Sequence, residues 1–139
     1  MLPLRKKQAT PAAPARRLDV VVADDVEEIT ELVTKWLEEA GHTVTRATDG
    51  REVMRLMRDK AFDLVVTDII MPNSDGWDAI LAINRMRPNT RILAISGGGK
   101  HMAADACLRV AKGVGADHLL RKPFNRGQLL AAVGQVMGR

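Results

Sequence analysis

Five short runs of aliphatic and β-branched residues alternate along the chain with longer stretches in which apolar residues recur at helical spacing. This alternation is typical of an α/β domain built around a parallel sheet. The first, third and fourth runs are almost continuously apolar, as expected for strands covered by helices on both faces. The five predicted strands are residues 18–23, 43–47, 62–67, 91–95 and 117–121.

The stretches between these runs are predicted to be helices, each with one apolar face. The clearest follows the first strand and ends at Gly41, a residue suited to cap a helix C-terminus. Asn125 is placed to cap the N-terminus of the last helix. Trp36 and Trp77 lie on apolar faces, so we predict that both pack into the core. The apolar positions of the five helices are Ile29, Leu32, Val33, Trp36, Leu37 and Ala40; Val53, Leu56 and Met57; Trp77, Ile80 and Leu81; Met102, Ala106 and Val110; and Leu129, Leu130, Val133, Val136 and Met137.

Composition indicates one domain preceded by a basic tail. The chain has 139 residues, of which 46% are hydrophobic and 27% charged, values close to those of globular domains. Residues 1–17 hold five basic residues and no acid, so the net charge of +4 is concentrated there. We predict a flexible tail over residues 1–17 and one domain over residues 18–139. A solvated arm is favoured for the tail over contact with nucleic acid or a membrane surface.

The single cysteine, Cys107, excludes a disulfide framework and a cysteine-rich zinc site. We predict that it packs as a small residue and is not a redox sensor. No apolar run approaches the roughly 20 residues of a membrane-spanning helix, and the N-terminus lacks the apolar stretch of a secretory signal. The sequence therefore predicts a cytoplasmic protein that is neither exported nor inserted in a membrane.

Polar residues gather just after the predicted strands. In an open parallel sheet, ligands bind outside the carboxyl ends of the strands, so these residues are expected to converge. Each alone has a simpler explanation, since an aspartate can cap a helix or open a turn. Together they predict a site. The residues are Asp24 and Asp25 after the first strand, Asp68 after the third, Ser96 after the fourth, and Lys122 with Pro123 after the fifth.

Three carboxylates in one place repel one another unless they share a cation or bind protons. Because the cluster has no histidine or cysteine, its oxygen ligands favour Mg²⁺ or Mn²⁺ over zinc. Mg²⁺ and Lys122 together balance the three carboxylates, which leaves a neutral site able to admit a phosphoryl group. A carboxylate can be the nucleophile that accepts this group as an acyl phosphate.

As a set, these residues resemble the receiver domains of two-component response regulators. The likeness runs from about Leu18 to the C-terminus. It implies a flavodoxin-like, doubly wound five-stranded parallel sheet of strand order 2-1-3-4-5 with helices on both faces. The motifs that carry it are Asp24-Asp25, Asp68 followed by IIMPNSDG, the hydroxyl of Ser96, and Gly115-Ala116-Asp117 leading to Lys122-Pro123-Phe124.

The resemblance also implies the chemistry of the site. Asp68 would accept a phosphoryl group from a phosphohistidine of a sensor histidine kinase or a histidine phosphotransfer protein. Asp25, Asp68 and the backbone carbonyl of Ile70 would bind Mg²⁺ (or Mn²⁺), with Asp24 acting directly or through water. The protein would be a phosphoacceptor with self-catalysed phosphorylation and dephosphorylation, and not an enzyme acting on other substrates.

The remaining site residues would hold the phosphoryl group and respond to it. Lys122 would contact a phosphoryl oxygen through a charge-assisted hydrogen bond. Ser96 would move to bond the group, with Gly97 beside it, and this movement would be the switch. Pro123 is expected to follow a cis peptide bond, which would aim Lys122 into the site.

Three positions depart from the family pattern. Leu119 stands where relatives usually have Tyr or Phe, a ring that turns inward when the switch operates. Either His118 takes over the role of this ring, or the segment after the fourth strand rearranges the output surface alone. We favour the second alternative. The run Gly97-Gly98-Gly99 predicts a loop that phosphate orders. Ile70 and Gly98 cannot orient a water molecule through a side chain, which predicts a long-lived phosphoryl group.

No output domain is visible in the sequence, so we expect a stand-alone receiver that signals through an unidentified target protein or passes its phosphoryl group on, without direct DNA binding. Three alternatives remain open. A flavodoxin-like flavin binder would need a phosphate-cradling loop where Asp24 and Asp25 stand. An aspartate-nucleophile phosphatase would need a second acid where Ile70 stands. A degenerate receiver would bind without being phosphorylated.

Overall fold

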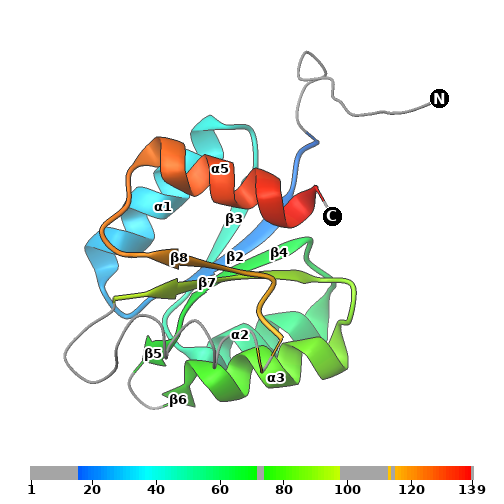
Figure 1. Ribbon diagram of the computed structural model, residues 1–139. Helices are drawn as coiled ribbons and strands as arrows, with labels where there is room; N and C mark the ends of the chain where they lie inside the picture. The colour runs from blue at the N-terminus through cyan, green and yellow to red at the C-terminus, as the bar shows by residue number, and fades with distance from the viewer. Residues whose placement is uncertain (1–15, 72–73, 98–112, 114, 139) are drawn as a thin grey trace.

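The structure is a computed structural model that describes residues 16–71, 74–97, 113 and 115–138. Its centre is a five-stranded parallel sheet whose order is β3-β2-β4-β7-β8, or 2-1-3-4-5 by chain order (Figure 1). This confirms the predicted topology. The strands are β2 (Asp19–Ala23), β3 (Thr43–Ala47), β4 (Leu64–Asp68), β7 (Arg91–Ser96) and β8 (His118–Arg121).

Helices cover both faces of the sheet, as predicted. The helices α1 (Glu27–Glu39) and α5 (Arg126–Met137) lie on one face, and α2 (Gly50–Asp59) and α3 (Gly76–Met86) on the other (Figure 1). The predicted helix over 102–113 and the predicted tail lie almost wholly outside the described residues, as do the side chains of Trp77 and Cys107.

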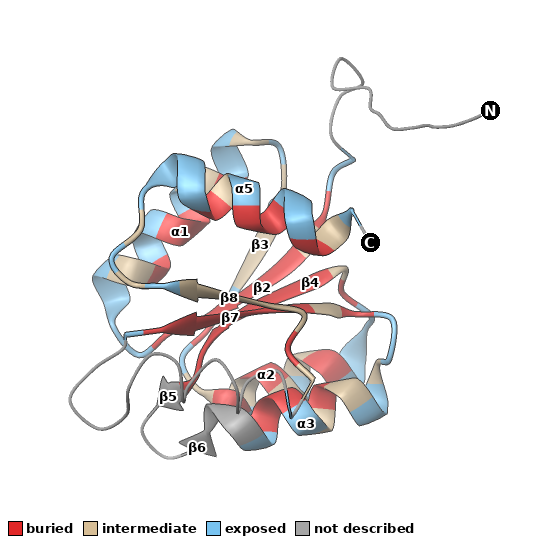
Figure 2. Cartoon of the chain, in the orientation of Figure 1, coloured by how far each residue is buried: buried red, intermediate tan, exposed pale blue. Residues whose placement is uncertain are grey.

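Strand alternation builds two apolar layers, because successive side chains of a strand point to opposite faces. In β2, Val20 and Val22 pack with α1 and α5, while Val21 and Ala23 pack towards α2 and α3. Figure 2 shows the central strands buried along their length. The two layers hold the carboxyl ends of the strands at fixed positions, and those ends carry the predicted site.

Local signals in the sequence account for several element ends. The Asn125 side chain accepts a hydrogen bond from the Gln128 amide, and the Gln128 side chain accepts one from the Asn125 amide, which makes a complete capping box. Gly41 follows α1 with φ of 99°, a conformation open to glycine. Trp36 is partly buried, packs against the apolar layer under α1 and α5, and meets Phe124 edge to face with 6.4 Å between ring centroids, so it lies at the border of the predicted core.

Some boundaries differ from the prediction. Asp68 and Ser96 are the last residues of β4 and β7, where we expected each to follow its strand. A second, two-stranded antiparallel sheet of β5 (Ile70–Met71) and β6 (Ser74–Asp75) was not predicted, because strands of two residues leave no readable alternation. Within the described ranges, no helix is long and apolar enough to cross a membrane.

Candidate functional site

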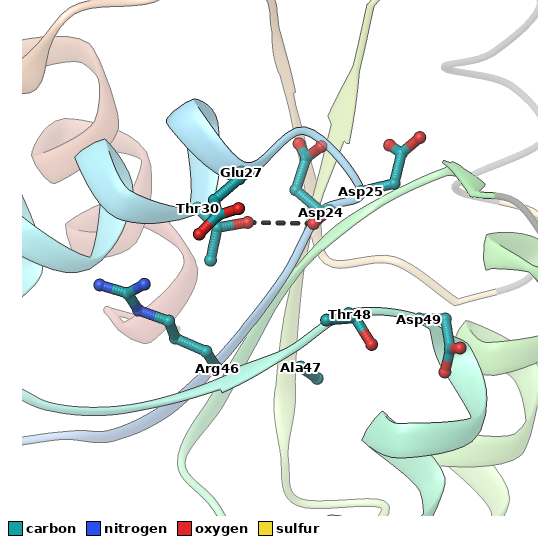
Figure 3. Close-up of a pocket in the computed structure, with 8 residues that line it drawn as sticks. All are labelled: Asp24, Asp25, Glu27, Thr30, Arg46, Ala47, Thr48 and Asp49. Atoms are coloured by element: carbon teal, nitrogen blue, oxygen red, sulfur yellow. Dashed lines mark hydrogen bonds between the residues drawn. The ribbon is translucent and has the colours of Figure 1, made fainter.

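Asp24 is held rigidly at the turn between β2 and α1. Its side chain is fully buried, and its Oδ1 accepts a hydrogen bond from the Val26 amide at 2.9 Å. Its backbone carbonyl accepts the hydroxyl of Thr30 on α1 at 3.0 Å (Figure 3). Burial of a carboxylate costs free energy unless nearby charges or hydrogen-bond donors compensate it. The turn alone therefore does not account for a buried aspartate at this position.

Neither aspartate of this turn caps α1, although capping was the simplest explanation for them. The N-cap residue is Val26, and no side chain makes the cap hydrogen bond. Asp25 is exposed at the mouth of the site, one residue beyond the buried Asp24. The first strand therefore presents one buried and one solvent-accessible carboxylate at its carboxyl end.

Asp68 lies at the end of the neighbouring strand. It pairs with Ile95 in the β4–β7 register, and its side chain is 9% exposed. The Ile69 amide donates to the Ile95 carbonyl at 3.1 Å, so the backbone on the far side of Asp68 is also fixed. The structure thus places Asp68 on the rigid edge of the sheet and not in a helix.

Lys122 reaches both buried carboxylates from the end of β8. Its Nζ lies 2.9 Å from Asp24 Oδ2 and 3.3 Å from Asp68 Oδ2. Burial alone would lower the pKa of Lys122, but the contact with Asp24 and the negative charges of Asp68 and Asp24 outweigh burial, so this pKa is raised above its usual value. The ammonium therefore stays charged and links three strand ends.

Ser96 and Pro123 complete the set. Ser96 is buried, and its carbonyl accepts the Lys122 amide at 2.8 Å, which ties the end of β7 to the lysine. The Lys122–Pro123 peptide bond is cis, as the resemblance implied. Gly97 is exposed beyond β7, and an added Cβ there would meet no atom within 4 Å. Gly98 and Gly99 lie outside the described residues.

The carboxylates fit the divalent cation that the sequence predicted. One oxygen from each of Asp24, Asp25 and Asp68 lies within 4.8 Å of the others. All the candidate side-chain ligands are oxygens, a set that suits Mg²⁺ or Mn²⁺ and not zinc. Ile70 opens β5, two residues after Asp68, and the role of its carbonyl as a further ligand stays a prediction.

The two residues proposed for the output surface lie on opposite faces of β8. Leu119 packs against the layer between the sheet and α2 and α3, whereas Leu120 packs against the layer under α1 and α5. Because strand side chains alternate, His118 points to the same face as Leu120. His118 therefore does not lie on the face that Leu119 takes. That the segment after β7 transmits the switch stays a prediction.

A pocket of about 400 Å³ opens beside the carboxylates, between α1 and the end of β3 (Figure 3). Four acids line it, opposed by Arg46. Sequence reasoning missed Thr48 and Asp49, which follow the second predicted strand, although the rule that pointed to the other strand ends applies equally there. The pocket is lined by Asp24, Asp25, Glu27, Thr30, Arg46, Ala47, Thr48 and Asp49.

The sequence is similar to those of known transcriptional regulatory proteins. The transcriptional regulatory protein TcrA of Mycobacterium tuberculosis is 33% identical over 112 residues, covering 81% of this chain and 43% of TcrA. CpxR of Escherichia coli, also a transcriptional regulatory protein, is 32% identical over 120 residues, covering 86% of this chain and 49% of CpxR. The chain therefore spans less than half the length of these relatives.

The fold is similar to those of solved response regulators. The chemotaxis response regulator CheY4 of Vibrio cholerae superposes with a TM-score of 0.78 at 30% identity, covering 86% of this chain and 98% of CheY4. NtrX of Brucella abortus gives a TM-score of 0.81 at 27% identity, covering 88% of this chain and 27% of NtrX. The model of the response regulator receiver domain matches residues 20–134. This chain therefore belongs to the response regulator receiver domains, the phosphoacceptor modules of two-component signalling.

Proposed function

We propose that Asp68 is the phosphoacceptor of this receiver and that Lys122, Asp24 and Asp25 serve its chemistry. One observation carries the proposal: the Asp68 carboxylate lies 3.3 Å from the partly buried ammonium of Lys122, with two further carboxylates close enough to share a cation. A nucleophilic carboxylate needs such neighbours, because phosphoryl transfer depends mainly on positioning and on neutralising charge.

The contacts of Asp68 and Lys122 support the following reaction. An oxygen of Asp68 attacks the phosphorus of a phosphohistidine, the O–P bond forms as the N–P bond breaks, and the electron pair returns to the imidazole nitrogen, which takes a proton from water. Asp25, Asp68 and the Ile70 carbonyl would hold Mg²⁺, with Asp24 acting directly or through water, and the ion would supply positive charge to the phosphoryl oxygens. Lys122 supplies a second positive charge from the end of β8, where it already contacts both buried aspartates.

The response of the protein begins at Ser96. Its hydroxyl donates to the new phosphoryl oxygens, and Gly97 gives the backbone beside it the freedom to follow. Because Ile70 and Gly98 offer no side chain that could orient an attacking water, we propose that the acyl phosphate outlives those of relatives with polar residues there. Decay measured in Mg²⁺ tests this, and a half-life of a few seconds would contradict it.

We further propose that the chain works as a single-domain response regulator, which docks on a target protein when phosphorylated or passes the group on. The likeness to CheY4, of which the chain covers 98%, supports this proposal. The second candidate is the receiver portion of a longer transcriptional regulator, and it is favoured by the likeness to the transcriptional regulatory protein TcrA, of which the chain covers 43%. Transfer of the phosphoryl group from the purified protein to a phosphotransfer protein distinguishes a relay from a dead-end regulator.

The test of the site is phosphorylation by acetyl phosphate or phosphoramidate with Mg²⁺, followed by intact-protein mass. We expect one added phosphate on the wild type and none on Asp68→Asn. Asp78→Asn is the matched control, since Asp78 is an exposed acid on α3, and it should accept one phosphate. Phosphate on Asp68→Asn, or on another residue of the wild type, would overturn the assignment.

A further inference from the structure

Two adjoining pockets lie at the amino ends of the strands, the edge of the sheet opposite to Asp68. One, of about 550 Å³, is walled by the residues before β4 and by the loop between α3 and β7. The other, of about 420 Å³, lies between α1, α5 and the start of β2. Arg16 and Met137 line both pockets, so the two adjoin. Figure 1 shows that the described chain begins near the end of α5.

The first pocket is basic. Three arginines line it, against Asp63 as the one acid among its lining residues. Arg16 is 68% exposed in its side chain and contacts Asp63 at 3.3 Å. The Nε of Arg87 donates to a neutral acceptor, the Met57 carbonyl, at 2.9 Å, and among the described residues no carboxylate forms an ion pair with this guanidinium. Arg91 lies 4.0 Å from Asp117. The arginine charge exceeds that of the carboxylates around it.

The second pocket is apolar. Leu18, Leu130, Val133 and Met137 give it a mainly apolar lining, to which Arg16 and His42 add polar groups. Gly134 on α5 leaves it open, since a Cβ added there would meet no atom within 4 Å. An apolar hollow beside a cluster of guanidinium groups presents two kinds of complementarity within one surface.

We infer that this surface binds an acidic peptide segment that also carries apolar side chains. Carboxylates of the segment pair with Arg16, Arg87 and Arg91, and a leucine-like side chain enters the hollow beside Gly134. A nucleic acid would leave the apolar hollow unused, and a flat lipid surface fits two concave pockets poorly. The site lies at the other end of the sheet from Asp68, so this inference goes beyond the proposed function and does not depend on it.

The segment before Arg16 strengthens the choice of an acidic partner. Residues 1–15 contain Arg5, Lys6 and Lys7 and no acid. Their charge would oppose their own binding to the arginine pocket, whereas it attracts an acidic segment and speeds its encounter.

The experiment measures fluorescence anisotropy of a short labelled peptide of glutamate, leucine and serine against the full, unphosphorylated chain. We expect saturable binding that weakens with salt, no binding of the peptide with lysine in place of glutamate, and weaker binding with serine in place of leucine. Because the readout is peptide binding without phosphate, its failure is distinguishable from failure of the phosphorylation test.

Matched variants separate a built site from general attraction. Arg16→Glu and Gly134→Leu should each weaken binding about tenfold or more, the first by reversing a charge and the second by filling the hollow. Arg51→Glu on α2 and Gln135→Leu on α5 are controls at exposed positions outside both pockets. Each should stay within about twofold of the wild type. Circular dichroism of every variant verifies the fold.

Four results would overturn the inference. The first is an equal loss of peptide affinity in Arg16→Glu and Arg51→Glu, and the second is wild-type peptide affinity in Gly134→Leu. The third is tighter binding of the protein to phosphatidylserine vesicles or duplex DNA than to the peptide. The fourth is a gain in peptide affinity when residues 1–15 are deleted. The last would identify that segment as the occupant of the surface. Unchanged or weaker binding after the deletion supports an acidic partner.

Discussion

At the scale of single residues, the buried hydroxyls of Thr90 and Thr34 differ in whether they have a hydrogen-bond partner. Thr90 Oγ1 donates to the Phe62 carbonyl at 2.7 Å, whereas Thr34 Oγ1 on α1 has no hydrogen-bond partner among the described residues. Both residues are about 4% exposed. An unsatisfied buried hydroxyl costs free energy, and valine has the same shape without that cost.

We therefore expect Thr34→Val to raise the free energy of unfolding by about 1 kcal/mol and Thr90→Val to lower it by about 1 to 2 kcal/mol, because the second leaves a buried carbonyl unpaired. Urea denaturation of the two variants beside the wild type measures both changes. A loss of stability in Thr34→Val would show that its hydroxyl has a partner.

His42 adds a pH dependence to stability. Its Nδ1 accepts the Leu18 amide at 3.1 Å, a contact that only an unprotonated nitrogen can make, and burial lowers its pKa below 6.5. The unfolded chain therefore binds the proton more readily than the folded chain. The contribution of His42 is complete above the unfolded pKa and declines as pH falls through 6.5 towards the lower folded value.

The variant His42→Asn keeps an acceptor near Nδ1 and removes the titration. We expect the difference in unfolding free energy between wild type and this variant to shift in favour of the variant as the pH falls from above to below 6.5. The same urea experiment at both pH values gives the difference. A difference that is independent of pH would contradict the assignment to His42.

At the scale of elements, the sequence predicted β2, β4 and β7 well because each is a dense apolar run with a polar residue at or just after its carboxyl end. The boundary of β4 shows the limit. Asp63 already bonds the backbone of Asp19 and Arg91, yet the assigned strand starts at Leu64. Which face a residue takes was also out of reach: His118 and Leu119 are adjacent, and only the packing of β8 separates their roles.

The loop before β8 is joined to α3 through Asn84 and Gly115. The side-chain amide of Asn84 donates to the Gly115 carbonyl at 3.0 Å. Gly115 has φ of 106°, and a Cβ there would lie 1.9 Å from Asn84 Nδ2. Glycine is thus required both by backbone conformation and by the approach of α3.

We expect Gly115→Ala to lower the free energy of unfolding by about 2 to 4 kcal/mol, from backbone strain and the clash together. In the Asn84→Ala background the clash is absent, so the same change should cost only about 1 to 2 kcal/mol. A double-mutant cycle by denaturation measures the coupling. Equal costs in both backgrounds would show that strain alone excludes alanine.

At the scale of the whole molecule, charge separates along the strands. Carboxylates gather around Asp24 at the carboxyl ends, and arginines around Arg87 at the amino ends. Sequence reasoning found the acidic cluster because its members follow strands directly. It missed the basic surface, since Arg16 is far along the chain from Arg87 and Arg91, which flank one loop, and the three meet only in the folded chain.

The cluster of Asp24, Asp25 and Asp68 should make the free energy of unfolding rise when a divalent cation binds. Asp24, Asp25 and Asp68 carry more negative charge than Lys122 offsets, so Mg²⁺ should bind the folded chain in preference to the unfolded chain. At a free Mg²⁺ concentration of ten times the dissociation constant, the expected gain in the free energy of unfolding is about 1.4 kcal/mol, or roughly 4 °C in melting temperature for a domain of this size.

Asp25→Asn removes an exposed ligand with little effect on folding and should abolish most of this gain. Glu28→Gln, which changes an exposed acid on α1, should retain it. Thermal melts with MgCl₂ and with KCl at matched ionic strength distinguish specific binding from screening, and an equal rise in both salts would show that no cation site is formed by these aspartates.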